Sequence, residues 1–122
     1  RYVEAQEAGL DEVSNWGTGS PTREFLHVAD AAEAIALAAE KDISSDPINL
    51  GTGIETSIAD LTTMIARAVG YEGAVAWDTS KPDGQPKRYL NVNRAKELLG
   101  FEAKIDLETG IQETVDWYRT NK

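Results

Sequence analysis

The sequence predicts a mixed α/β (α+β) fold in which helices surround a few short strands. Residues 30–41 and 58–69 carry alanine or apolar residues at helical spacing, with capping residues at their starts. The remaining apolar runs are short and are bounded by glycine or proline, which is typical of strands. With 122 residues, 41% of them hydrophobic, the chain can bury the core of one domain.

The N-terminal part predicts a helix, a weak strand and a turn. Residues 2–8 favour a helix, and Gly9 is suited to end it. Residues 11–16 predict a strand whose polar side chains indicate an edge position. The glycines and the proline of residues 17–21 then predict a tight turn, because glycine accepts positive φ and proline fixes φ near a turn value.

A strand and an alanine-rich helix are expected next. The apolar residues 25–28 predict a buried strand. Asp30 is expected to cap the helix over residues 30–41, with Glu33 as its partner in a capping box. Residues 42–47 predict a loop.

Residues 48–50 predict another short strand, which the glycines of residues 51–53 would end. A Gly-x-Gly pair after a strand suggests a dinucleotide-binding turn, but that pattern needs a third glycine where Thr56 stands. We therefore do not assign a cofactor site to this turn. The following helix, residues 58–69, is the clearest amphipathic segment of the chain, and Ser57 is its expected cap.

The C-terminal half predicts one more strand and two helices. Residues 74–77 form a short apolar run, and residues 78–88 form a loop rich in proline and charge. Asn93 is expected to cap a short helix that ends at Gly100. Asp106 is expected to cap the last helix, which carries apolar residues on one face.

The composition excludes several functional classes. Twelve Lys and Arg against 21 Asp and Glu give a net charge of −9, which argues against general binding of nucleic acid or anionic membranes. The chain has no cysteine, which excludes disulfides, thiolate metal sites and cysteine nucleophiles and is consistent with a cytoplasmic location. No apolar run approaches the length of a membrane span, and the N-terminus does not resemble a signal peptide.

Two basic places stand out in this acidic chain. Residues 81–96 contain five basic residues and one acidic residue. Arg23 lies between a stiff turn and a predicted strand, which suits its guanidinium group to bidentate recognition of phosphate. A structural ion pair with one of the many carboxylates is the alternative. We expect Arg23 and the loop 81–88 to converge on one diphosphate.

The run from Arg23 to Asp30, Arg-Glu-Phe-Leu-His-Val-Ala-Asp, resembles the motif that opens the substrate-binding part of extended short-chain dehydrogenases. That superfamily includes nucleotide-sugar epimerases, dehydratases and reductases. Residues 16–23 and 81–88 are similar to the GDP-L-fucose synthase family, whose members epimerise and reduce GDP-4-keto-6-deoxy-mannose. The similarity runs from about Tyr2 to the C-terminus.

The resemblance implies that the chain is the C-terminal, nucleotide-sugar-binding portion of a longer enzyme, over residues 1–122, without the Rossmann half. It implies an NADP(H)-dependent, cytoplasmic, homodimeric parent that binds its cofactor outside this chain. A GDP-sugar is the expected partner, and no membrane or nucleic acid. A UDP- or dTDP-sugar epimerase or dehydratase is one alternative, and a non-catalytic nucleotide-binding module is the other.

The resemblance also implies substrate contacts at Trp16, Arg23, Asp83, Lys87 and Arg88. It leaves open whether Lys87 or Arg88 meets the phosphate. From the residues alone, Trp16 could instead pack in a core, and Asp83 could instead bond the backbone of its own turn.

No catalytic residue is expected in this chain. His27, the single histidine, lies in an apolar run and predicts a hydrogen-bonded structural role. Tyr118 and Lys122 match the Tyr-x-x-x-Lys spacing of short-chain dehydrogenases, but they fall at the end of the chain, where a helix frays. We interpret that match as a coincidence. The 122-residue chain by itself should therefore not oxidise NADPH.

Overall fold

The computed structural model describes residues 1–41 and 46–122, and within them it confirms a mixed α/β fold with few, short strands. The elements in chain order are α1 (Tyr2–Glu7), β1 (Glu12–Trp16), β2 (Thr22–Arg23), α2 (Val28–Glu40), β3 (Thr56–Ser57), α3 (Ile58–Val69), β4 (Ala74–Asp78), the π-helical turn η1 (Ala95–Leu99) and α4 (Leu107–Asn121). Most of the predicted loop 42–47 lies outside the described residues.

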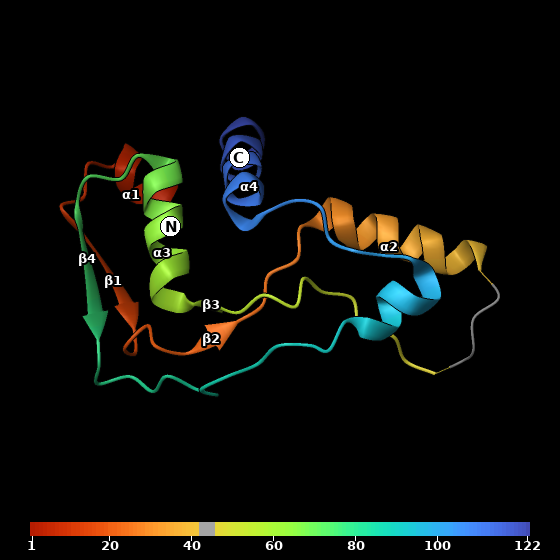
Figure 1. Ribbon diagram of the computed structural model, residues 1–122. Coiled ribbons are helices and arrows are strands. Elements are labelled where there is room, and N and C mark those ends of the chain that lie inside the picture. Colours follow the sequence, from red (N-terminus) through yellow and green to blue (C-terminus); the bar gives the residue numbers. More distant parts are fainter. Residues whose placement is uncertain (42–45) are drawn as a thin grey trace.

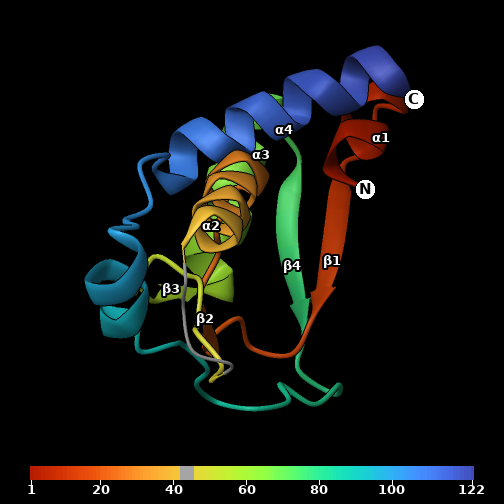
Figure 2. The same cartoon turned by 90° about the vertical axis from the view of Figure 1, so that its right-hand side faces the viewer.

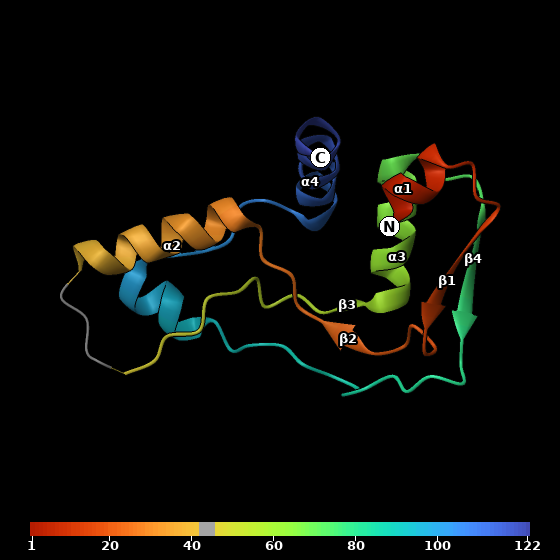
Figure 3. The ribbon, with the colours of Figure 1, turned by 180° about the vertical axis from the view of Figure 1, so that it is seen from behind.

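The elements form two groups with α4 between them (Figure 1). One group holds α1, β1, α3 and β4, and β1 pairs with β4 in parallel. The other group holds α2 and η1. Strand β2 pairs antiparallel with β3, and these segments run between the two groups, together with the chain that follows β4 (Figure 3).

Helix α4 crosses over α3 and ends beside α1, so the two ends of the described chain are neighbours (Figure 2). The hydroxyl of Tyr118 donates a hydrogen bond to Glu4 Oε1 at 2.9 Å, which links the two helices. No helix in the described part of the chain is both long and apolar enough to cross a bilayer.

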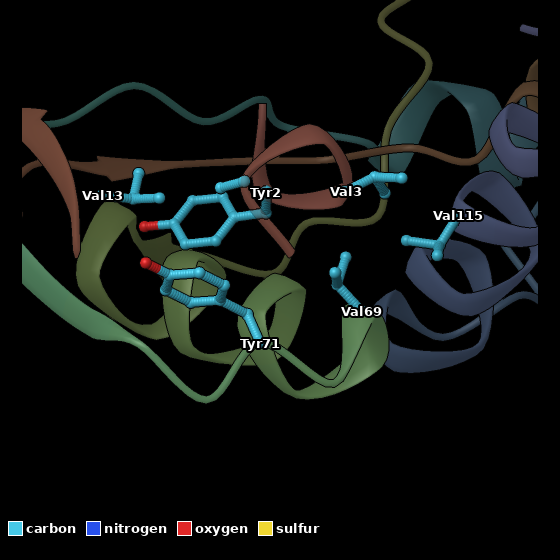
Figure 4. Close-up of a cluster of buried hydrophobic side chains, with 7 residues drawn as sticks. Tyr2, Val3, Val13, Val69, Tyr71 and Val115 are labelled. Carbon is cyan, nitrogen blue, oxygen red and sulfur yellow. The ribbon is translucent and has the colours of Figure 1, made fainter. Parts of the chain in front are cut away.

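The core of the first group lies where α1, α3 and α4 meet (Figure 4). The rings of Tyr2 and Tyr71 pack edge to face, with centroids 5.5 Å apart, an arrangement that aromatic rings favour. The Tyr71 hydroxyl donates to the carbonyl of Leu10 at 3.0 Å, which satisfies its polar end. Val69 and Val115 bring α3 and α4 to the same core.

A second core joins α2 to η1 through Ala34, Ala95, Leu99 and Phe101. Asp30 lies beside it with only 2% of its surface exposed. Its Oδ2 accepts the N–H groups of residues 104 and 105, at 3.2 and 3.0 Å. The prediction that Asp30 caps α2 was therefore wrong, because this carboxylate satisfies a distant backbone segment instead.

The strand predicted over residues 25–28 was also wrong. Strand β2 ends at Arg23, and α2 begins at Val28. His27 is the N-cap, and its Nδ1 accepts the N–H of Ala29 at 3.4 Å. The apolar signal of Leu26 reflects packing against the second core rather than pairing in a sheet.

The predicted strand over residues 48–50 is not formed either. Ile48 and Leu50 pack against the second core, and the Asn49 amide donates to the carbonyl of Asn91 at 3.3 Å. Asn93 does not cap η1: Arg94 occupies the cap position, and no side chain makes a capping hydrogen bond there.

Two helix caps and two strands are present as predicted from the sequence. Ser57 caps α3, where its Oγ accepts the N–H of Asp60 at 2.9 Å, and Gly70 ends the helix at φ 73°. Asp106 caps α4 through the N–H of Thr109 at 2.9 Å. The weak strand at residues 11–16 and the strand at 74–77 are β1 and β4, the two members of one small sheet.

Candidate functional site

Strand β2 holds the central position of the candidate site. On one side Arg23 pairs with Thr56 of β3. On the other side the N–H of Thr22 donates to the carbonyl of Pro86 at 2.9 Å, and the N–H of Arg88 donates to the carbonyl of Thr22 at 3.2 Å. The basic loop predicted from charge is therefore fixed to the strand that carries Arg23, although nearly sixty residues of chain separate Arg23 from the start of the loop.

One face of this arrangement is closed by an ion pair. Thr22 and Lys87 form a parallel bridge, so their side chains lie on the same face. The carboxylate of Glu55 accepts the Thr22 hydroxyl at 2.9 Å and lies 2.6 Å from Lys87 Nζ. These hydrogen bonds, that from Lys87 first, lower the pKa of Glu55, and the same carboxylate raises the pKa of Lys87.

The opposite face carries the two arginines. Successive side chains in an extended segment alternate between faces, so Arg23 and Arg88 point away from Glu55. Both arginines line a pocket of about 350 Å³. The remaining lining residues come from the segments around residues 24–26, 50–51 and 89–90. Lys87, in contrast, is absent from this lining. Its Nζ lies over the ring of Tyr89, 4.6 Å from the ring centroid.

Arg23 is not part of an ion pair with any described carboxylate. Its Nη1 donates to the carbonyl of Thr22 at 2.7 Å, which holds one terminal nitrogen of the guanidinium group. The structural ion pair considered as an alternative for Arg23 is therefore absent from the described residues, and Arg23 and Arg88 line one pocket.

Glu24 lines the same pocket and was not identified from the sequence. Its Oε1 accepts the N–H groups of Thr52 at 2.6 Å and Gly53 at 3.0 Å. Its Oε2 accepts the N–H of Leu90 at 2.8 Å. The glycine turn at residues 51–53, which does not match a dinucleotide fingerprint, is thus a binding site for an internal carboxylate.

Asp83 and Trp16 lie outside this pocket. The Asp83 carboxylate accepts the backbone N–H of Thr18 at 2.6 Å and its hydroxyl at 2.8 Å, so it ties the loop after β4 to the turn after β1. Trp16 is 72% exposed, and Lys81 Nζ lies 5.9 Å from its ring centroid. Trp16 does not pack in a core, and Asp83 bonds a distant turn instead of its own.

Gly84 connects this second group to the pocket. A Cβ placed on Gly84 would lie 4.0 Å from Arg23 Nη2. Since Asp83 precedes Gly84, the loop segment that Asp83 ties to the turn after β1 also passes Arg23. Of the five predicted residues, Arg23 and Arg88 line the pocket, whereas Trp16, Asp83 and Lys87 are not among its lining residues.

A second pocket, of about 360 Å³, lies between α3, α4 and the start of α2. Its lining is mainly apolar and contains no lysine or arginine. His27 contributes to it, and His27 Nε2 also lies 3.5 Å from Glu113. This pocket offers no cation for a phosphate, and His27 has the hydrogen-bonded role predicted for it.

Tyr118 and Lys122 do not form a catalytic pair. Tyr118 donates to Glu4, and this hydrogen bond raises the pKa of the phenol. Lys122 pairs with Glu7. A tyrosine that acts as a proton donor or acceptor near neutral pH needs a pKa shifted downwards, so the local environment opposes that chemistry.

Comparison with solved structures defines the class of the fold. A GDP-L-fucose synthetase from Naegleria fowleri, solved with NADP, superposes with a TM-score of 0.91 over 98% of this chain at 31% identity. A UDP-glucose 4-epimerase from Thermotoga maritima, solved with UDP-glucose, superposes with a TM-score of 0.85 over 98% of this chain at 32% identity. The fold is that of part of an extended short-chain dehydrogenase.

The sequence narrows the assignment. The family model described as GDP-mannose 4,6 dehydratase matches residues 1–114. The chain belongs to this family of nucleotide-sugar enzymes. GDP-L-fucose synthase 1 of Arabidopsis thaliana is 40% identical over 99% of this chain.

The match covers only part of each relative. This chain spans 37% of the Arabidopsis protein and 38% of each of the two solved chains. The activity of those whole enzymes is therefore not assigned to this chain by similarity alone.

Proposed function

We propose that this chain is the C-terminal, substrate-binding portion of an NADP-dependent enzyme that epimerises and reduces GDP-4-keto-6-deoxy-mannose. The observation that carries the proposal is the placement of Arg23 and Arg88 on one pocket of about 350 Å³ in a chain of net charge −9. Two guanidinium groups on rigid backbone suit the oxygens of a diphosphate. Similarity to GDP-L-fucose synthases favours a GDP-sugar as the ligand.

The residues of this chain would contribute binding and orientation. Holding the diphosphate fixes the far end of the substrate, so that the sugar is presented to a reacting centre elsewhere in the enzyme. Binding energy from such remote groups reduces the entropic cost of reaching the transition state. Trp16 and Asp83, on the surface beyond Gly84, are proposed to contact the remainder of the substrate.

NADPH supplies the hydride in this reaction, and we place its site outside this chain. The glycine turn at residues 51–53 does not fit the cofactor's pyrophosphate, because Glu24 already accepts two of its N–H groups. Thr56 also stands where the fingerprint requires glycine. We further propose a cytoplasmic, homodimeric parent enzyme, as the resemblance implies.

Calorimetric titration with GDP and with NADPH tests the proposal. The titrated protein is the proposed full-length enzyme that contains this chain, called the intact protein below. Arg23→Ala should weaken GDP binding by about 1.5–3 kcal/mol, the range for a hydrogen bond to a charged group, and leave NADPH affinity unchanged. Arg23→Lys should restore part of the loss, because lysine lacks the bidentate fork. Arg67→Ala is a matched control, since Arg67 is an exposed arginine of α3 beside Glu108.

If Arg23→Ala binds GDP as tightly as the unaltered protein does, the proposed diphosphate site is wrong. A UDP-sugar is the second candidate ligand, favoured by the superposition on the Thermotoga epimerase, and a dTDP-sugar is a further alternative. Titration with UDP and dTDP beside GDP separates these ligands, because all three present the same diphosphate. An intact protein that binds GDP but never oxidises NADPH with a keto sugar would indicate a non-catalytic nucleotide-binding module.

A further inference from the structure

We infer that Glu24 is a positioning residue that holds Arg88 in place for the diphosphate. This inference rests on the proposed function. Glu24 follows Arg23 directly in the chain and reaches across the pocket to two other segments. Its two oxygens accept three backbone N–H groups, at 2.6, 3.0 and 2.8 Å.

The two oxygens serve different segments. Oε1 binds the turn at residues 52–53, and Oε2 binds Leu90, two residues after Arg88. Arg88 is therefore held on both sides, by its N–H bond to Thr22 and by the Leu90 bond to Glu24. A short segment fixed at both ends has few alternative backbone conformations, so its arginine is oriented before a ligand arrives.

A carboxylate in the wall of an anion site would ordinarily pair with the nearby cations. Here no ion pair joins Glu24 to Arg23 or Arg88 within the part of the chain that the structure describes. The three N–H donors occupy the oxygens of Glu24 and offset part of its charge. Arg23 Nη1 donates to the Thr22 carbonyl, but neither guanidinium group is occupied by a described carboxylate.

The turn at residues 51–53 is shaped for this carboxylate. A Cβ placed on Gly51 would lie 1.9 Å from Glu24 Oε1 and 2.9 Å from its Cδ. Any side chain at position 51 would therefore occupy the place of the carboxylate. Glycine at position 51 leaves room for the carboxylate of Glu24. That carboxylate in turn binds Leu90 and so holds the segment that carries Arg88.

The test replaces Glu24 with its near-isosteric amide in the intact protein. Glu24→Gln keeps one acceptor oxygen but turns an NH2 group toward one of the two segments, where it meets N–H donors. GDP affinity measured by calorimetry should fall about tenfold, with NADPH affinity unchanged. Asp30→Ala is the control: Asp30 also bridges to distant backbone N–H groups but does not line the pocket, so GDP affinity should change less than about twofold.

A double-mutant cycle separates positioning from a general loss of stability. If Glu24 acts through Arg88, then Glu24→Gln should weaken GDP binding less than about twofold once Arg88→Ala is present. A full tenfold additional loss in that background would overturn the inference, as would unchanged GDP affinity in Glu24→Gln alone. If the unaltered protein binds none of GDP, UDP and dTDP, the proposed function itself fails, and this inference with it.

Discussion

The carboxylate of Glu24 occupies the space that a Cβ at position 51 would need. A Cβ placed on Gly51 would lie only 1.9 Å from Glu24 Oε1. These residues are 27 positions apart, yet each restricts what the other can be. The relationship explains why the packing of the site requires glycine at position 51.

Gly51→Ala should therefore destabilise the protein by displacing Glu24 from its N–H partners. Because these hydrogen bonds are lost and the site is locally overpacked, the free energy of unfolding should fall by about 1–3 kcal/mol. Urea denaturation measures this change. The same substitution in a Glu24→Ala background should cost clearly less, since the obstructing carboxylate is gone. Equal costs in both backgrounds would show that the contact does not govern position 51.

Asp30→Ala should also reduce stability, and for a reason that differs from the capping predicted from sequence. Removing this buried carboxylate leaves the N–H groups of Lys104 and Ile105 without their acceptor. The expected loss is about 1–3 kcal/mol in the free energy of unfolding. Glu40→Ala, at the exposed end of the same helix, should change it by less than about 0.5 kcal/mol. A similar small change in Asp30→Ala would contradict the assigned role.

The contrast between Asp30 and Ser57 shows what local sequence can predict. Ser57 caps α3 through Asp60, three residues away, and such caps can be identified from a short window. Asp30 bonds residues 74 and 75 positions away, and nothing near it in the sequence indicates that partner. The strand predicted over residues 48–50 failed for a related reason, because an apolar run forms a strand only where another strand pairs with it.

The site was predictable in part for the same reasons. The local excess of cations in an acidic chain indicated the loop 81–88, and the position of Arg23 between a turn and a predicted strand indicated Arg23. Which face Arg88 occupies depends on the bridge between Thr22 and Lys87, which is a property of the folded chain. Glu24 was missed because its partners are backbone groups 28 to 66 residues away, which leave no side-chain signal.

The Glu55–Lys87 pair should make stability depend on pH at both extremes. The pKa of Glu55 is lowered from 4.5 by its hydrogen bond from Lys87, so its contribution is complete above pH 4.5 and is lost as the pH falls through the folded value. The pKa of Lys87 is raised from 10.5, so its contribution is lost as the pH rises through that folded value.

Urea denaturation across pH measures this effect. The difference in unfolding free energy between the unaltered protein and Glu55→Gln should be constant near neutral pH and shrink below pH 4.5. Lys87→Met should give the same acid dependence as Glu55→Gln, because either change removes the pair. A difference that persists undiminished at low pH would show that the pair does not contribute.

The 122-residue chain by itself should self-associate. Val28 and Trp117 are 75% and 64% exposed and line one pocket of about 470 Å³, and exposed apolar patches of this kind promote association. Sedimentation should show oligomers at high concentration, and Val28→Lys with Trp117→Lys should reduce them. Leu10→Lys, at an exposed apolar position between α1 and β1, is the control and should have little effect. A clean monomer at high concentration would argue against this prediction.

Substitution of Lys87 and Arg88 should resolve which of these neighbours meets the diphosphate. The alternation of side chains along the segment paired with Thr22 directs Lys87 to Glu55 and Arg88 to the pocket. Arg88→Ala should therefore weaken GDP binding of the intact protein by about 1.5–3 kcal/mol, as predicted for Arg23→Ala.

Lys87→Ala removes a charge of the same sign one residue away and is the matched control. Its effect on GDP affinity should stay below about twofold at physiological ionic strength, because an exposed charge already paired with a carboxylate contributes little at a distance. Raising the salt concentration should reduce this residual effect further but leave most of the Arg88 effect. A larger loss of GDP affinity in Lys87→Ala than in Arg88→Ala would contradict this assignment. It would mean that Lys87 leaves Glu55 to bind the ligand and that Arg88 does not contact the diphosphate.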